Sequence, residues 1–154
     1  MIRIRAAEFP KDLAVVRGLL HEYAESLGVD LCFQGFEAEL ASLPGAYAPP
    51  RGRLLLAWNG DDAVGCVALR PLAGNDCEMK RLYVQPHVRG TRIGRDLAER
   101  LCSEAREAGY SRMYLDTLPS MEAAQKLYAS LGFRSTGPYV FNPVPGARFL
   151  TLEL

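Results

Sequence analysis

The chain has 154 residues, 49% of them hydrophobic, and its 18 basic and 18 acidic residues cancel to a formal net charge of zero. This length suits one domain with a sizeable core and is short for two, so we expect a single domain over residues 1–154. The balanced charge argues against a dedicated nucleic-acid-binding or membrane-surface protein. No apolar run approaches the length of a membrane span, and the first residues contain no apolar signal core.

The four cysteines, Cys32, Cys66, Cys77 and Cys102, are scattered along the chain without a Cys-x-x-Cys pair, and only two histidines accompany them. This pattern favours neither a metal site nor a disulfide framework. We therefore expect reduced thiols, a cytoplasmic protein and no bound metal.

The first third of the chain predicts one strand and two helices. Isoleucine alternates with arginine over residues 2–5, which indicates a short strand. Apolar residues then recur at helical spacing over residues 10–27, and Gly28 follows as a typical residue after a helix end. A second short helix is expected over residues 36–40, and it should stop before Pro44.

The middle of the chain predicts a hairpin and a third neighbouring strand. Apolar strands over residues 53–58 and 63–70 flank the segment Asn59-Gly60-Asp61-Asp62. An Asn-Gly pair tolerates the positive φ angles of a tight hairpin turn. Residues 77–84 then form the next expected strand.

The last third alternates helices and strands. A helix should begin after the segment 89–94 and end near Gly109, because Ile93, Leu97, Leu101 and Ala105 recur every fourth residue. The later elements are expected to be a strand over 111–117, a helix capped by Ser120, and strands over 133–136 and 147–154. Together the elements predict an α/β fold with a mixed sheet.

The segment "RGTRIG", residues 89–94, connects the fourth expected strand to a helix. A strand, a turn and a helix in this order present unpaired backbone N–H groups at the helix start, where the dipole favours an anion. The segment lacks the Gly-Lys-Ser/Thr of a Walker loop and the third glycine of a dinucleotide fingerprint. A phosphate or pyrophosphate is one expected occupant, and a solvated basic turn is an equal alternative on this segment alone.

Its surroundings favour the first alternative. Residues 78–97, "EMKRLYVQPHVRGTRIGRDL", closely resemble the signature of the Gcn5-related N-acetyltransferase (GNAT) superfamily, in which the loop binds the pyrophosphate of acetyl-coenzyme A. Residues 114–133, "YLDTLPSMEAAQKLYASLGF", resemble the fifth strand and following helix of the same superfamily. The resemblance covers essentially the whole chain. It implies a mixed, mostly antiparallel sheet of about seven strands with four helices, in which strands four and five splay apart at the cofactor.

The same resemblance implies an acetyl-coenzyme A-dependent N-acetyltransferase that acts by direct transfer within a ternary complex. In the loop, Arg89, Ile93 and Gly94 match the superfamily pattern, whereas Arg92 replaces a glycine. Arg92 still supplies a backbone N–H, provided that its dihedral angles are ordinary. The residues expected at the cofactor are Leu82, Tyr83, Val84, Arg89, Gly90, Thr91, Arg92, Ile93 and Gly94, with the Leu82 N–H facing the thioester oxygen.

Three further residues are candidates for the chemistry. Tyr128 matches a tyrosine that in relatives donates to the departing thiolate, although a core aromatic is the alternative. A thiol near ~8.5 and a phenol near ~10 make full proton transfer uphill by about 2 kcal/mol, so hydrogen-bond donation is favoured. Glu78 is a candidate base, and a charge pair with Lys80 or Arg81 is its alternative. Asp116 is a second candidate base or a turn residue, and water is a third route.

The acceptor groove of the superfamily is walled by the first two helices and by the loop between the last two strands, here residues 137–146. Tyr139 and Phe141 of this loop are expected either to pack on a ligand or to close the core. A small amine or amino-acid derivative is the favoured acceptor, with a protein lysine or N-terminus as an alternative. A non-catalytic acyl-coenzyme A-binding or regulatory module is the competing function, and the oligomeric state, including a homodimer, is left open.

Overall fold

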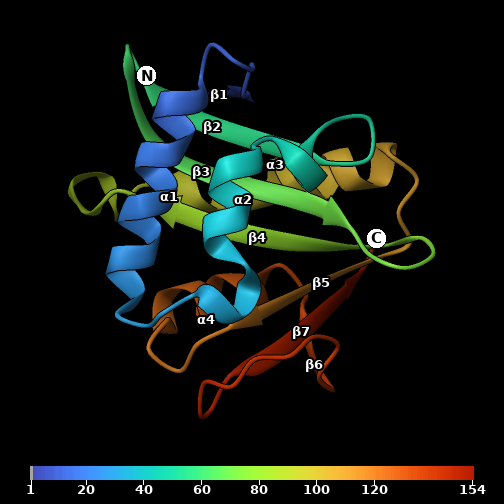
Figure 1. The fold of residues 1–154 in the computed structure, drawn as a ribbon. Helices are drawn as coiled ribbons and strands as arrows, with labels where there is room; N and C mark the ends of the chain where they lie inside the picture. The colour runs from blue at the N-terminus through green and yellow to red at the C-terminus, as the bar shows by residue number, and fades with distance from the viewer. Residues whose placement is uncertain (1) are drawn as a thin grey trace.

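The computed structural model describes residues 2–154, which form a seven-stranded sheet in the order β1-β2-β3-β4-β5-β7-β6 (Figure 1). All neighbouring strands are antiparallel except β4 and β5, which run parallel. The strands are β1 Ile2–Ala6, β2 Arg53–Asn59, β3 Asp62–Pro71, β4 Asp76–Val84, β5 Arg112–Thr117, β6 Arg134–Thr136 and β7 Arg148–Glu153.

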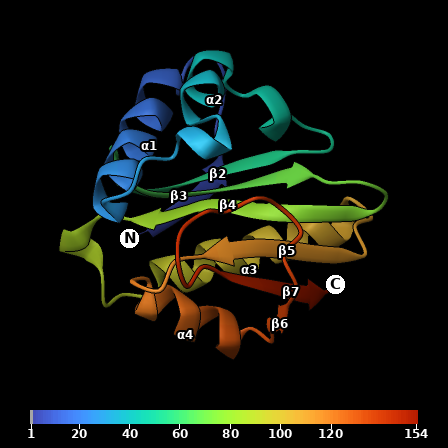
Figure 2. The ribbon, with the colours of Figure 1, turned by 60° about the horizontal axis from the view of Figure 1, so that its bottom comes forward.

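Four helices cover the two faces of this sheet. They are α1 Leu13–Leu27, α2 Phe36–Ser42, α3 Ile93–Glu107 and α4 Glu122–Ser130. With the sheet turned on edge, α1 and α2 lie on one side and α3 and α4 on the other (Figure 2). Short 3₁₀ turns at Cys32–Gln34, Gly45–Tyr47 and Pro86–Val88 complete the chain. The expected mixed sheet with four helices is confirmed.

Strand alternation creates a separate core on each face. Along β2, Leu54 and Leu56 belong to the cluster beneath α1 and α2, whereas Leu55 and Ala57 belong to the cluster beneath α3. Successive side chains of a strand point to opposite faces, so a strand that is covered on both sides is apolar throughout. Each fully buried leucine contributes roughly 1.5–3 kcal/mol of transfer free energy. These cores hold β2, β3 and β4 rigidly in the centre of the sheet.

The parallel contact between β4 and β5 is short. Its register covers only Asp76, Cys77 and Glu78, which face Arg112, Met113 and Tyr114. Beyond Glu78 the two strands separate, as the resemblance implied, and the separation is visible between the β4 and β5 arrows of Figure 1. The rest of β4 therefore turns backbone groups toward an opening inside the sheet.

A bulge changes the path of β4 beside this opening. Arg81 has φ +62°, and it is the one non-glycine residue among residues 2–154 with a positive φ. The register between β3 and β4 shifts between Cys66 and Ala68, opposite this position. A bulge bends a strand and re-aims the groups next to it. Here the next residue is Leu82, whose backbone borders the opening.

Most of the expected element boundaries lie within a few residues of those in the structure, and the hairpin turn at Asn59–Asp62 is confirmed, with Gly60 at φ +61°. One cap is wrong. Helix α4 begins at Glu122, its N-cap residue is Met121, and no side chain caps it, so Ser120 lies before the helix. A serine caps a helix only from the residue directly before the first helical turn.

Candidate active site

A run of three cavities crosses the opening between β4 and β5. The first, of about 530 Å³, lies between the end of β4, the start of α3 and α4. A small central cavity of about 20 Å³ shares Tyr23, Leu82 and Met121 with it. A third cavity, of about 420 Å³, lies among α2, β4 and the 137–146 loop, and shares Lys80 and Asp116 with the central one. Adjacent cavities therefore share lining residues, and the three form a row, or path, across the sheet.

The glycine loop, residues 89–94, lines the first cavity at the start of α3. Gly90 has φ +88°, which only glycine adopts readily. Among residues 2–154, the backbone N–H groups of Gly90, Thr91 and Arg92 have no acceptor, and α3 begins directly after them. Unpaired donors at the start of a 15-residue helix create a site for an anion. The predicted cofactor residues that line this cavity are Leu82, Tyr83, Val84, Arg89, Gly90, Thr91 and Gly94.

The other two predicted cofactor residues lie outside the cavity wall. Arg92 has φ −88° and ψ 12°, so it adopts ordinary dihedral angles without glycine, as expected. Its side chain is 72% exposed and lies 3.9 Å from the carboxylates of Asp96 and Glu99 along α3. Ile93 is buried in the core beneath the sheet. The side chains of these two residues therefore point away from the cavity, and the Ile93 N–H donates to Thr91 Oγ1 at 3.4 Å.

Arg89 is held against the end of β4. Its Nε donates to the Val84 carbonyl at 3.0 Å, and its guanidinium lies 5.9 Å from the centroid of the Tyr83 ring. The Tyr83 hydroxyl in turn donates to Glu22 at 3.2 Å. The Arg89 guanidinium, which lines the first cavity, is thus positioned by the end of β4.

Tyr128 lies on α4 and lines the central cavity. Its ring packs edge-on against Phe133, with centroids 5.7 Å apart, which fixes the ring. Burial raises the pKa of the Tyr128 hydroxyl above its usual range, so this group keeps its proton near neutral pH. A buried, protonated phenol that borders a cavity is a hydrogen-bond donor rather than a proton source.

Glu78 lies on β4 with only 1% of its side chain exposed. One carboxylate oxygen accepts from Arg70 Nε at 2.6 Å and the other accepts from the Tyr139 hydroxyl at 2.6 Å. The expected alternative, a pair with Lys80 or Arg81, is wrong, because both of these side chains turn to α2 and the turn before it. Both carboxylate oxygens of Glu78 therefore already accept a hydrogen bond from within the protein.

Asp116, at the end of β5, lines both the central and the third cavity. One of its oxygens accepts from the Asn142 side chain at 2.9 Å, and among residues 2–154 the carboxylate has no ion-pair partner. The expectation that Asp116 faces the acceptor side is therefore consistent with its position. The other oxygen is available to a bound molecule.

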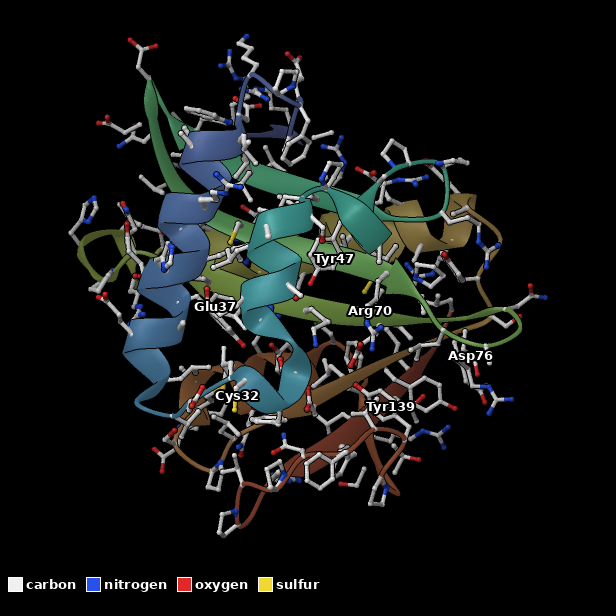
Figure 3. The ribbon with its side chains drawn as sticks, in the orientation of Figure 1. Cys32, Glu37, Tyr47, Arg70, Asp76 and Tyr139 are labelled. Carbon is white, nitrogen blue, oxygen red and sulfur yellow. The ribbon has the colours of Figure 1, made fainter. Side chains whose placement is uncertain are left out.

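The loop over residues 137–146 forms the outer wall of the third cavity. Tyr139 packs on Tyr114 with centroids 5.0 Å apart and on Phe149 at 5.9 Å, so it closes the core at this edge. Phe141 is 73% exposed and lines the cavity, with its ring edge-on to Phe33. Tyr139 therefore takes the expected role in the core, whereas Phe141 is exposed at the cavity wall. Figure 3 shows Tyr139 near Arg70.

Several polar residues that line the cavities were not predicted as site residues, and Lys80, Gln34 and Tyr23 each line two of the cavities. Lys80 and Gln34 line the central and third cavities, and Tyr23 lines the central and first. Lys80 had a usable signal, because it lies two positions after Glu78 and so shares its strand face. Tyr23 and Gln34 carried none, since helix and turn residues reach the site only through tertiary packing.

Comparisons with known proteins agree with this geometry. The sequence model of the "Acetyltransferase (GNAT) family" matches residues 17–133. An uncharacterised N-acetyltransferase of Schizosaccharomyces pombe is 42% identical over 99% of this chain and 95% of its own length. An "IAA acetyltransferase" of Azospirillum brasilense is 39% identical over 70% of this chain and 71% of its own. The crystal structure of PaiA N-acetyltransferase from Thermoplasma acidophilum, in complex with coenzyme A, is 16% identical, with a TM-score of 0.80, and the match covers 100% of this chain and 99% of that one.

The chain belongs to the acetyltransferase (GNAT) family, and it is an N-acetyltransferase. Its sheet, with one parallel pair and four helices, is the fold of these neighbours. Each helix within residues 2–154 is too short or too polar to cross a membrane. Over the same residues, no group of three or more His, Cys, Asp and Glu side chains is arranged to hold a metal ion.

Proposed function

We propose that this single-domain protein transfers the acetyl group of acetyl-coenzyme A directly to the primary amine of a small molecule, within a ternary complex. The observation that carries the proposal is the path of three cavities across the opening between β4 and β5. The first cavity ends at the anion site of the glycine loop, and the third is lined by charged side chains. The small central cavity lies between them. Two substrates that enter from opposite ends would meet beside Tyr128.

The first cavity fits the cofactor. The unpaired N–H groups of Gly90, Thr91 and Arg92 would hold the pyrophosphate, and the end of β4 offers its backbone to the extended arm. Gly94, which lines the same cavity, places no side chain at the helix start. Bound acetyl-coenzyme A supplies an activated acyl group as a thioester.

Two groups of the chain would serve the reacting atoms. The Leu82 N–H, which follows the bulge at Arg81, would donate to the thioester oxygen, where negative charge develops. The Tyr128 hydroxyl would donate a hydrogen bond to the departing sulfur. Its raised pKa makes donation more favourable than complete proton transfer.

The acceptor amine must lose a proton at the central cavity. Asp116 is the nearer candidate to receive it or to orient the amine, since one of its oxygens is unoccupied. Glu78 remains a candidate only through a water relay, because Arg70 and Tyr139 already occupy both of its oxygens. The third cavity, at about 420 Å³, is of the size that holds small molecules.

The test is a thiol-release assay with acetyl-coenzyme A across amines, amino acids and peptides. We expect turnover with small amines, and we expect Gly94→Asp to abolish it by blocking the phosphate site. Turnover restricted to peptides or proteins would overturn the small-molecule acceptor. Tight cofactor binding without turnover on any acceptor would favour a non-catalytic acyl-coenzyme A-binding module.

A further inference from the structure

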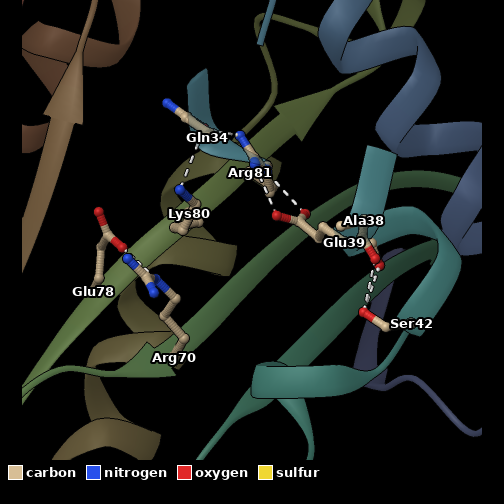
Figure 4. A network of polar contacts seen from close by, with 8 residues as sticks. All are labelled: Gln34, Ala38, Glu39, Ser42, Arg70, Glu78, Lys80 and Arg81. Atoms are coloured by element: carbon tan, nitrogen blue, oxygen red, sulfur yellow. Dashed lines mark hydrogen bonds and ion pairs between the residues drawn. The ribbon is translucent and has the colours of Figure 1, made fainter. Parts of the chain in front are cut away.

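The third cavity contains two charged groups of opposite sign that lack an ion-pair partner. Its other charges are neutralised: Arg70 pairs with Glu78 at 2.6 Å, and Glu39 pairs with Arg81 at 2.8 Å. Among residues 2–154, Lys80 donates only to the Gln34 side chain, at 3.2 Å, and forms no ion pair. Figure 4 shows this contact beside the two completed pairs.

The second such charge is Asp116, which accepts only from Asn142 within the same residues. Lys80 and Asp116 both line the third cavity and the central cavity, and neither lines the first cavity with the glycine loop. Lys80 is therefore too far along the path to bind the cofactor phosphates. The two charges face the place where an acceptor meets the thioester.

A half-buried ammonium without a counterion is unfavourable. Burial is the main cause that lowers the pKa of Lys80, and the neighbouring Arg81 charge adds to it, while the Glu78 and Asp116 carboxylates act in the opposite direction. An anion in this cavity would offset both effects, and it would interact more strongly than at a solvent-exposed surface, because less water screens the pair. A bound ammonium group would likewise be attracted to the Asp116 carboxylate.

We propose that the acceptor is an amino acid, whose carboxylate binds Lys80 and whose amino group is held by the free oxygen of Asp116. This inference rests on the proposed function and narrows its substrate class. A simple alkylamine would leave the Lys80 charge without a partner, and a polyamine would bring a second cation toward it. An amine beside its own carboxylate satisfies both residues at once.

The experiment compares each L-amino acid with its carboxamide. The two acceptors have nearly the same size, but the carboxamide lacks the negative charge. Its amino group also has a lower pKa than that of the free amino acid, close to the ~7.7–8.0 of a peptide α-amino group, so amine reactivity alone would favour the carboxamide. A preference for the amino acid therefore reports recognition of the carboxylate.

For the wild type we expect kcat/KM to be at least about tenfold higher for the accepted amino acid than for its carboxamide, as for one charge-assisted hydrogen bond. Lys80→Gln should raise KM for the amino acid and remove this preference, and Lys80→Arg should keep part of it. Asp116→Asn should lower kcat/KM by the same factor for the amino acid and for its carboxamide. Lys126→Gln, on the exposed face of α4, is the matched control and should leave the preference unchanged. Thermal melts check that each variant is folded.

Three results would overturn the inference. Carboxamides or simple amines that are used as well as amino acids by the active enzyme would contradict it while the proposed function stands. A preference that Lys80→Gln leaves intact in a folded enzyme would show that another group binds the carboxylate. If no small amine of any kind is acetylated, the proposed function itself fails, and this inference fails with it.

Discussion

Arg81 of β4 and Glu39 of α2 form a two-point ion pair, in which Nε and Nη2 donate to separate carboxylate oxygens at 3.0 and 2.8 Å. A third donor of Arg81, Nη1, binds the Gln34 side chain (Figure 4). The Arg81 side chain is 1% exposed and its backbone has φ +62°. The pair therefore holds the Arg81 bulge in place from α2, which lies on the sheet. It also connects α2 to β4, the strand that borders the first cavity.

Glu39→Gln should destabilise the protein by about 3 kcal/mol, because it leaves a buried guanidinium with only neutral partners. Chemical denaturation measures this loss. Glu37→Gln, on the exposed side of the same helix, is the control and should change stability by less than about 0.5 kcal/mol. Equal stability of the two variants would show that the pair adds nothing to the fold.

Gly94→Asp should weaken acetyl-coenzyme A binding by at least about tenfold, since it places a negative charge beside the phosphate site. Gly94→Ala is the matched control. A Cβ at this position would lie 3.7 Å from Val84 and 3.9 Å from Leu127, which are ordinary contacts, so alanine should bind nearly as the wild type does. Calorimetry measures both affinities, and undiminished binding by the aspartate variant would place the phosphates elsewhere.

Arg92→Gly should preserve cofactor affinity, because the guanidinium is exposed and lies beside Asp96 and Glu99, while the backbone supplies the N–H group. The same calorimetric titration gives the comparison. A loss of tenfold, about 1.4 kcal/mol, would instead make the Arg92 side chain a phosphate ligand.

Tyr128→Phe should lower turnover on the order of 10²-fold while leaving cofactor affinity unchanged. The sulfur carries negative charge only as the thioester bond breaks, so the lost hydrogen bond belongs to the transition state. Steady-state kinetics measure the turnover of this variant, and a thermal melt checks that it is folded. Tyr110→Phe is the control, because it removes a hydroxyl that donates to the Arg51 carbonyl and lies outside the three cavities. Unchanged turnover in a folded Tyr128→Phe enzyme would leave Tyr128 as a core aromatic.

Cys32 should react with an alkylating reagent much faster than the other three thiols of the native protein. Cys32 is exposed, whereas burial raises the pKa of Cys66 and of Cys77 to about 12. At pH 8 such a thiol is ionised to a fraction on the order of 10⁻⁴, and this fraction grows as the pH rises. Mass spectrometry should find one modified cysteine, none in Cys32→Ser, and four after denaturation.

Local patterns were enough to predict the elements of the fold. The fourfold spacing from Ile93 to Ala105 marks the buried face of α3, and all four residues of that series are buried in the structure. The Asn59-Gly60 turn likewise depends on its own dihedral preferences. The separation of the fourth and fifth strands was expected instead from the resemblance, because pairing between distant segments leaves no local trace in the sequence.

The candidate site was predicted less completely, for the same reason. The partner of Glu78 is Arg70, eight residues away on a neighbouring strand, and only the β3–β4 register brings the two together. The bulge at Arg81 was not expected, since arginine has no preference for a positive φ. Its side chain is held by residues of α2 and the preceding turn, which the strand sequence does not contain.

The short contact between β4 and β5 also has a thermodynamic consequence. Only three residue pairs join the two strands, so the hydrogen-bonded sheet is interrupted in its interior. A cofactor that fills this interruption binds the folded chain and not the unfolded one. At a hundred times its dissociation constant, such a ligand adds about 2.7 kcal/mol to the free energy of unfolding. The stability of the protein would then follow the concentration of the acyl donor around it.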